Sequence, residues 1–370
     1  MNRFLRAGVA AAVLMSTLTQ LHAQLLIGQT AGFTGPVAEG VKEITEGARL
    51  WINAVNGRGG IGGQKIELVS LDDKFDPKLA VENARKLEER GVLALFLTRG
   101  TPNTEAILPV LAAGELPLVA PSTGAILLHQ PVNRRVFNVR TTYQREAEKA
   151  ADHLVALGMS RIAVVTPDDS FGADVQKGIS RGFERAKSKP VADLSVDRLK
   201  PDINKIVQTI VGAQAQAVIW VGTGTAVSDG VKALRAAGSA AQVLTLSNAA
   251  SSGFVRITGD AARGVIVTQV FPNERSGGSA MVREATELAR AAGINAVSPA
   301  MLEGYAGAKV LVEGLRRAGR NPTRASLQAG LEGINKFDLG GLEVSYSPTD
   351  HTGLDFSELS MIGPDGSFRR

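Results

Sequence analysis

Small hydroxyl side chains follow the apolar runs of this sequence in four places, where they could bind an anion. Hydroxyl groups and free backbone N–H groups at helix starts can donate hydrogen bonds to a carboxylate, whose charge the helix dipole also favours. Ser and Thr at helix starts usually serve only as caps, so the argument depends on the four segments together. The four segments are GFTGP (32–36), TRGTPNT (98–104), APSTGA (120–125) and PDDSFG (167–172). Together they indicate a cleft that could bind an anion.

Catalytic and metal-binding chemistry finds little support in the sequence. His129, His153 and His351 are scattered, without the i, i+4 pairing of a helical metal site, and the chain has no Cys. No G-x-S-x-G nucleophile motif occurs. The three acids of LDDKFD (71–76) lack the Gly and distant Glu of a calcium loop, so we interpret them as a strand end and a helix cap. We therefore expect no enzyme activity, no metal and no cofactor.

The glycines of NGRGGIGG (56–63) match a dinucleotide-binding fingerprint at Gly57, Gly59 and Gly62. A functional fingerprint follows a strand and opens a helix, because the helix N-terminus holds the pyrophosphate. Here the glycines follow a helical pattern and precede an apolar run. We expect them to end the helix and turn the chain.

The elements that must position these side chains alternate between strands and helices. This alternation predicts an α/β fold with mainly parallel sheets covered by helices, in two units. Ligands of such sheets bind outside the carboxyl ends of the strands. The expected strands are 25–28, 64–71, 92–97, 116–121, 161–167, 217–222 and 242–247, and helices are expected at 76–91, 101–114 and 145–158.

The N-terminus reads as an export signal over residues 1–23. Arg3 and Arg6 precede a short apolar run (7–18), and Leu21-His22-Ala23 suits signal cleavage, so the mature chain would start at Gln24. A membrane anchor is the alternative, but the apolar run is short for a bilayer. Without Cys, no lipid can be attached at the cleavage site. The net charge of +5 is small, and the positive and negative residues are interspersed along the chain, so we expect no nucleic-acid or membrane-surface partner.

The sequence resembles the periplasmic solute-binding proteins of ABC importers, of the branched-chain amino acid type. Segments carrying the resemblance include GFTGP, the block from Glu46 to Leu87 and IAVVTPDDSFGAD (162–174). The resemblance implies two Rossmann-like α/β lobes enclosing the ligand, with crossovers near Thr141, Val270 and Tyr346. The first lobe would comprise residues 24–141 and 271–345, and the second residues 142–270 and 346–370.

The resemblance also implies which residues bind the ligand carboxylate. Thr101 matches the hydroxyl residue that binds this group in the family. Ser122, Thr123 and Gly124 lie in the segment that contacts carboxylate and ammonium in amino-acid binders. Phe171 matches the aromatic residue that closes the site from the second lobe.

The residues that contact the ligand ammonium in the family are not retained in this sequence. The position of the acid that pairs the ligand ammonium holds Ser247, followed by Asn248, and the family's tyrosine is replaced by Gly224 or Thr225. A buried ammonium without a carboxylate partner would cost several kcal/mol, on the order of 3–5. We therefore expect a small organic or aromatic acid without an α-ammonium.

Arg99, next to Gly100, is a candidate for a second contact with the anion. The alternative for Arg99 is a surface residue near the mouth of the cleft. The expected function is a monomeric periplasmic receptor that closes over its solute and delivers it to an inner-membrane ABC permease with a cytoplasmic ATPase. The alternatives are a genuine amino-acid binder, a periplasmic sensor docking to a membrane receptor, and an exported hydrolase.

Overall fold

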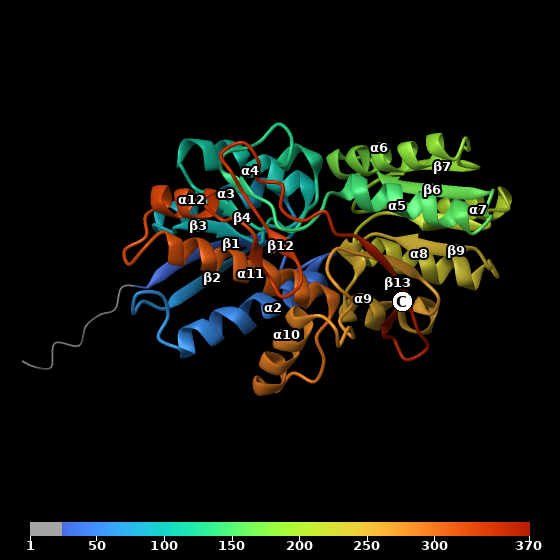
Figure 1. Ribbon diagram of the computed structural model, residues 1–370. Helices are drawn as coiled ribbons and strands as arrows, with labels where there is room; N and C mark the ends of the chain where they lie inside the picture. Colours follow the sequence, from blue (N-terminus) through green and yellow to red (C-terminus); the bar gives the residue numbers. More distant parts are fainter. Residues whose placement is uncertain (1–23) are drawn as a thin grey trace, which may run out of the picture.

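The computed structural model describes residues 24–370, so the predicted export signal lies outside the described residues. The described chain forms two α/β lobes that lie side by side (Figure 1). Blue, cyan and orange segments make up the first lobe, and green and yellow segments make up most of the second. None of the helices described within residues 24–370 combines the length and the hydrophobicity of a membrane-spanning segment.

The first lobe contains a five-stranded, fully parallel sheet in the order β2-β1-β3-β4-β5. Helices α2 and α11 pack on one face, where the side chains of both helices bury their apolar stripes against β1 and β3; α3 and α4 cover the other face. The strands are β1 (Leu25–Ala31), β2 (Ile66–Asp72), β3 (Ala94–Phe96), β4 (Leu118–Val119) and β5 (Val136–Phe137). The helices are α2 (Ala38–Gly57), α3 (Pro77–Glu89), α4 (Thr101–Ala113), α10 (Ala280–Ala291), α11 (Pro299–Arg317) and α12 (Arg324–Glu332).

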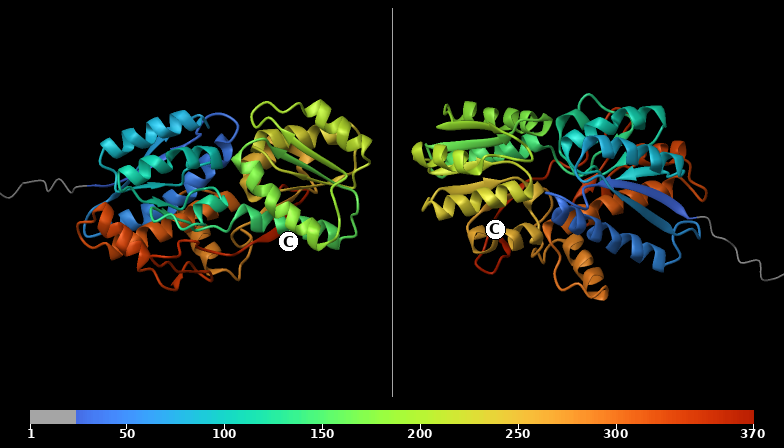
Figure 2. Two further views of the ribbon diagram at one scale, coloured as in Figure 1. Left: turned by 90° about the horizontal axis from the view of Figure 1, so that it is seen from above. Right: turned by 180° about the vertical axis from the view of Figure 1, so that it is seen from behind.

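The second lobe contains a seven-stranded sheet in the order β14-β13-β10-β9-β8-β6-β7, of which β13 and β14 run antiparallel to their neighbours. Helices α5 and α6 cover one face, and α7, α8 and α9 cover the other (Figure 2). The strands are β6 (Ile162–Pro167), β7 (Ala192–Val196), β8 (Ala217–Trp220), β9 (Gln242–Thr245), β10 (Ile266–Gln269), β13 (Glu358–Ile362) and β14 (Phe368–Arg369). The helices are α5 (Tyr143–Ala156), α6 (Ser170–Arg185), α7 (Ile203–Gly212), α8 (Gly224–Ala236) and α9 (Ser252–Thr258).

Short elements complete the described chain. Three 3₁₀ turns lie in the loops, and a two-stranded ribbon follows α12. These elements are η1 (Ile126–Leu128), η2 (Ser247–Ala249), η3 (Gly259–Ala262), β11 (Phe337–Asp338) and β12 (Glu343–Val344).

The third crossover lies further along the chain than the sequence resemblance implied. Tyr346 donates a hydrogen bond to the carbonyl oxygen of Asn138 and packs on Phe137, so it belongs with the first lobe. Leu354 still lies in the first lobe's core, and the chain joins the second sheet only at Glu358. We therefore place this crossover between Leu354 and Glu358 rather than near Tyr346.

The glycine-rich segment 56–63 turns the chain between α2 and β2, as its position in the sequence predicts. Gly59, Gly60, Gly62 and Gly63 all have positive φ, which favours glycine. A Cβ on Gly60 would collide with the carbonyl oxygen of Gln64. These four glycines therefore have a structural role in the turn.

Candidate functional site

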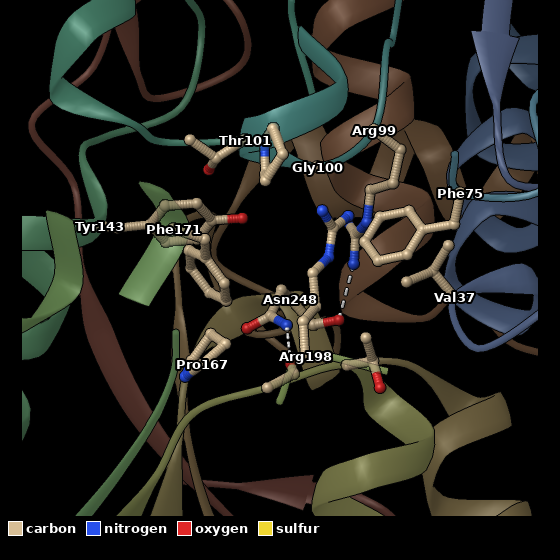
Figure 3. A pocket seen from close by; sticks show the side chains of 13 residues that line it. Val37, Phe75, Arg99, Gly100, Thr101, Tyr143, Pro167, Phe171, Arg198 and Asn248 are labelled. Carbon is tan, nitrogen blue, oxygen red and sulfur yellow. Dashed lines mark hydrogen bonds between the residues drawn. The ribbon is translucent and has the colours of Figure 1, made fainter. Parts of the chain in front are cut away.

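A cavity with about 370 Å³ of space between protein atoms lies where the two lobes meet. Its lining comes from loops after the strands of both sheets and from the start of α4 (Figure 3). The first lobe contributes Val37, Phe75, Arg99, Gly100, Thr101 and Pro102, and the second contributes Tyr143, Pro167, Phe171, Arg198, Gly222, Thr223 and Asn248.

The start of α4 forms one wall of the cavity. Gly100 is the N-cap residue and has a φ of 90°, and Thr101 is the first residue of the helix. The hydroxyl of Thr101 shares a hydrogen bond of 2.8 Å with that of Thr123. A helix N-terminus favours negative charge, so this wall suits an anion.

Arg99 places a nearly buried cation beside this helix start. Its side chain is 5% exposed, with Nη1 donating to Ser122 Oγ and Nη2 donating across the cleft to the carbonyl oxygen of Asn248, both at 2.8 Å. Among the described residues, no carboxylate lies within 4 Å of its guanidinium. Burying a charge without a counter-charge is costly, so the arrangement favours an anionic ligand.

Arg198 reaches from the second lobe to the first. Its guanidinium stacks on the ring of Phe75 at 3.8 Å, and its Nη2 donates to Asn103 Oδ1 at 3.1 Å. Its Nε lies 3.4 Å from Asp169 Oδ2, so this second cation has a counter-charge from its own lobe. Burial lowers the pKa of Arg198, and Asp169 opposes that effect.

The opposite side of the cavity is aromatic. The rings of Tyr143 and Phe171 lie 4.6 Å apart, and Arg140 stacks under Tyr143 at 4.5 Å. The Tyr143 hydroxyl points into the cavity and forms no hydrogen bond within the described chain (Figure 3). Burial raises the pKa of Tyr143, so the phenol keeps its proton and can donate to a ligand.

Five of the residues proposed from the sequence line this cavity, and the others lie around it. Arg99, Gly100, Thr101, Phe171 and Asn248 form part of the wall. The remaining six contact the wall from behind or lie beside it, and they are Ser122, Thr123, Gly124, Gly224, Thr225 and Ser247.

The six residues outside the wall have structural partners of their own. Gly124 packs against the first crossover and accepts a hydrogen bond from the backbone N–H of Tyr143 at 2.7 Å. Gly224 and Thr225 line a neighbouring cavity, where the Thr225 hydroxyl donates to the carbonyl oxygen of Pro36 at 3.2 Å. Ser122 and Thr123 hold the side chains of Arg99 and Thr101.

Ser247 faces a buried ion pair rather than the cavity. Its hydroxyl accepts a hydrogen bond of 2.8 Å from Arg140, and its backbone N–H donates to Glu146 at 3.0 Å. Glu146 pairs directly with Arg140, so that carboxylate is already neutralised. No Asp or Glu side chain is among the residues that line the cavity.

Phe75, Tyr143 and Arg198 were not anticipated from the sequence. Phe75 lies within LDDKFD and has an unusual positive φ of 63°, which the sequence does not reveal. Tyr143 starts α5, two residues before the expected helix start, and Arg198 lies in a loop after an edge strand. The one sequence signal that could have indicated a cavity residue is the position of Phe75, an aromatic residue among the acids that follow β2. Within residues 24–370, no group of three His, Cys, Asp or Glu could hold a metal ion.

Comparisons with known proteins agree with this architecture. A family model described as "Periplasmic binding protein" matches residues 24–355. The Leu/Ile/Val-binding protein homolog 3 of Brucella melitensis is 25% identical over 355 residues, which cover 94% of each chain.

Solved structures extend the similarity to three dimensions. A substrate-binding periplasmic protein from Ralstonia solanacearum is 31% identical with a TM-score of 0.87, covering 94% of this chain and 99% of that one. A "possible leucine/isoleucine/valine-binding protein" from Rhodopirellula baltica is 27% identical with a TM-score of 0.87, covering 95% and 97%.

Proposed function

The chain belongs to the periplasmic binding protein family, and we propose on this premise that it is the solute-binding component of an ABC importer. It is of the branched-chain amino acid type, a group of periplasmic solute-binding proteins rather than enzymes. In this proposal it binds a small solute between its lobes and delivers it to an inner-membrane permease with a cytoplasmic ATPase. The cavity between the lobes supports this role, because it is enclosed by residues from both sides.

The surroundings of Arg99 support the further proposal that the solute is a small carboxylate. Its buried guanidinium has hydroxyl and carbonyl partners but no carboxylate within 4 Å among the described residues. A ligand carboxylate would supply the missing counter-charge through charge-assisted hydrogen bonds. The start of α4 and the Tyr143 hydroxyl add donors to the same anion.

The composition of the lining argues against an α-ammonium on the solute. Two arginines and no acid line the cavity, so a ligand ammonium would meet repulsion and find no carboxylate partner. The rings of Phe171 and Tyr143, with Pro167, instead suit an apolar or aromatic body. We therefore propose an organic or aromatic acid without an amino group.

Ligand binding is coupled to closure of the lobes. Arg99 and Arg198 each reach across the cleft, and opening must break their contacts with Asn248, Asn103 and Phe75. A ligand that contacts both lobes at once shifts the equilibrium toward the closed form, which the permease recognises in this proposal.

Branched-chain amino acid binding is the second candidate. The relative from Brucella melitensis carries the name Leu/Ile/Val-binding protein homolog 3, and the two chains match over nearly their full lengths. In that case another acceptor would have to replace the carboxylate that the cavity lining lacks.

A thermal-shift panel tests these candidates against each other. The exported protein is unfolded and refolded to remove bound ligand, then heated with aliphatic, aromatic and dicarboxylic acids and with leucine, isoleucine and valine. A ligand at about 100 times its Kd should add about 2.7 kcal/mol to the stability. We expect shifts with the monocarboxylic acids alone, whereas a shift with the amino acids alone would overturn the proposed ligand class and leave the transport role intact.

A further inference from the structure

The orientation of the Asn248 side-chain amide is fixed by its surroundings. Its Nδ2 donates to the carbonyl oxygen of Gly222 at 2.7 Å. A carbonyl oxygen can only accept, so the amide nitrogen must face Gly222 and the amide oxygen must face elsewhere. The amide therefore cannot rotate to offer a donor to the cavity without losing this bond.

The Asn248 Oδ1 atom is buried and has no hydrogen-bond partner among the described residues. Asn248 lines the cavity, and its side-chain oxygen points toward the Pro167 and Phe171 side (Figure 3). Its backbone oxygen lies on the other side, where it accepts from Arg99. Asn248 thus presents an unpaired acceptor toward the aromatic end, away from the cationic end.

A carboxylate cannot satisfy this acceptor. Carboxylate oxygens only accept hydrogen bonds, so placing one against Asn248 Oδ1 would bring two acceptors together. The donors that suit a carboxylate come from Arg99, the start of α4 and Tyr143. An acceptor left unpaired in a closed cavity costs free energy that a donor on the ligand would remove.

We propose that the ligand carries a neutral hydrogen-bond donor, such as a hydroxyl group, which binds Asn248 Oδ1 at the end away from its carboxylate. The inference rests on the proposed carboxylate function and narrows it to hydroxylated, or otherwise donor-bearing, small acids. The donor is neutral because two arginines and no acid line the cavity. Phe171 and Pro167 then enclose the ring or chain that joins the two ends.

Calorimetric titration with matched acids tests the proposal on the refolded, ligand-free protein. The pairs are benzoate with 4-hydroxybenzoate, phenylacetate with 4-hydroxyphenylacetate, and 3-phenylpropanoate with its 4-hydroxyphenyl counterpart; tyrosine and leucine test the ammonium. We expect the hydroxylated member of at least one pair to bind at least tenfold more tightly than its parent, because only it pairs the buried acceptor.

A variant of Asn248 tests whether a preference for the hydroxylated acid depends on the Asn248 Oδ1 atom. Asn248→Leu removes the acceptor and should abolish the preference for the hydroxyl while the parent acid still binds. Asn321→Leu makes the same change at an exposed site outside the cavity and should leave the preference unchanged.

The possible results separate this inference from the function on which it rests. Equal binding within every pair would overturn the donor proposal and leave the carboxylate function standing, with water as the partner of Asn248. A hydroxyl preference that survives in Asn248→Leu would also overturn the proposal. Binding of amino acids alone, or of no compound in the panel, would contradict the carboxylate function and the donor proposal together.

Discussion

Arg99 contributes a positive charge to the cavity that the described part of the protein leaves without a carboxylate partner. We expect Arg99→Met to weaken binding of the acid ligand by about 100-fold, or about 2.7 kcal/mol, through loss of charge-assisted hydrogen bonds. The ligand-free variant should be at least as stable as the wild type, because Arg99 forms no ion pair within the described chain whose loss would destabilise the protein. Titration calorimetry and urea unfolding measure the two effects separately.

A merely structural role for Arg99 would give the opposite pattern. Arg99→Met would then lower the stability of the ligand-free protein and leave the affinity of the refolded fraction unchanged. Arg135→Met is a suitable control, since this arginine pairs with Glu115 and Gln328 outside the cavity.

We expect Asp73 to make the stability of the loop that holds Phe75 depend on pH. The carboxylate accepts hydrogen bonds from the Phe75 backbone N–H at 2.8 Å and the Thr30 hydroxyl at 3.0 Å, but burial raises its pKa from 3.8 to about 6. For an acid whose pKa is raised by folding, the stabilisation is complete below pH 3.8 and is lost as the pH rises through about 6.

We expect Asp73→Asn to unfold with a free energy larger than the wild type at pH 7.5, on the order of 2 kcal/mol, and similar to it at pH 4. Urea unfolding at pH 4, 6 and 7.5 measures this difference, and the same substitution at the exposed Asp229 provides the control. A variant less stable than the wild type at pH 7.5 would show that the ionised carboxylate stabilises the loop, against this interpretation.

Helices α2 and α9 form a contact between the lobes that lies outside the cavity. Glu43 on α2 accepts hydrogen bonds from the backbone N–H groups of Ser252 at 3.0 Å and Gly253 at 2.6 Å, and Glu39 pairs with Arg256. Opening of the lobes must break these bonds. We therefore expect them to stabilise the closed form without contacting the ligand.

We expect Glu43→Ala to release the bound ligand about tenfold faster, since hydrogen bonds to a charged group contribute about 1.5–3 kcal/mol. The association rate should change little, because these contacts form only on closure. Stopped-flow measurement with Glu46→Ala, an exposed residue on the same helix, provides the comparison. Unchanged dissociation in Glu43→Ala would mean that these bonds do not contribute to closure.

The elements were more predictable from the sequence than the lining of the site. Apolar runs located β1, β2, β3, β4, β6, β8 and β9, because buried parallel strands need continuous apolar residues, although β4 pairs over only two residues of the expected six. The sequence analysis did not anticipate β5, β7, β10, β13 and β14. The cleft was expected at the loops that follow the strands, because ligands of parallel α/β sheets bind outside the carboxyl ends of the strands. Side-chain directions were not predictable: Ser247 and Asn248 are adjacent, yet one contacts Arg140 and the other lines the cavity.

Contacts that depend on closure were also beyond the sequence. Arg198 and Phe75 are far apart in the chain and belong to different lobes, and their stacking depends on how the lobes meet. No pattern within a short stretch of the sequence predicts the contact between Arg198 and Phe75. The third crossover was placed too early for a related reason, because Tyr346 and Leu354 pack against the first lobe through long-range contacts.

At the scale of the whole molecule, we propose that the two lobes close on an anionic ligand. We expect small-angle X-ray scattering to show a smaller radius of gyration when the ligand-free protein receives its acid ligand, because bonds such as Arg99 to Asn248 form only when the lobes meet. Arg99→Met with the same ligand should show no such decrease. A radius that does not change in the wild type would contradict closure by the ligand.

The proposal that this family member selects a carboxylate without an α-ammonium can be tested by calorimetric titration of two matched pairs. The ligand-free protein is titrated with 3-phenylpropanoate and with L-phenylalanine, which differ only in the α-amino group, and 4-methylpentanoate with L-leucine repeats the comparison for an aliphatic body. We expect the acid of at least one pair to bind at least 100-fold more tightly than its amino acid, since no carboxylate lines the cavity to hold an ammonium. Tighter binding of the amino acid in both pairs would contradict it.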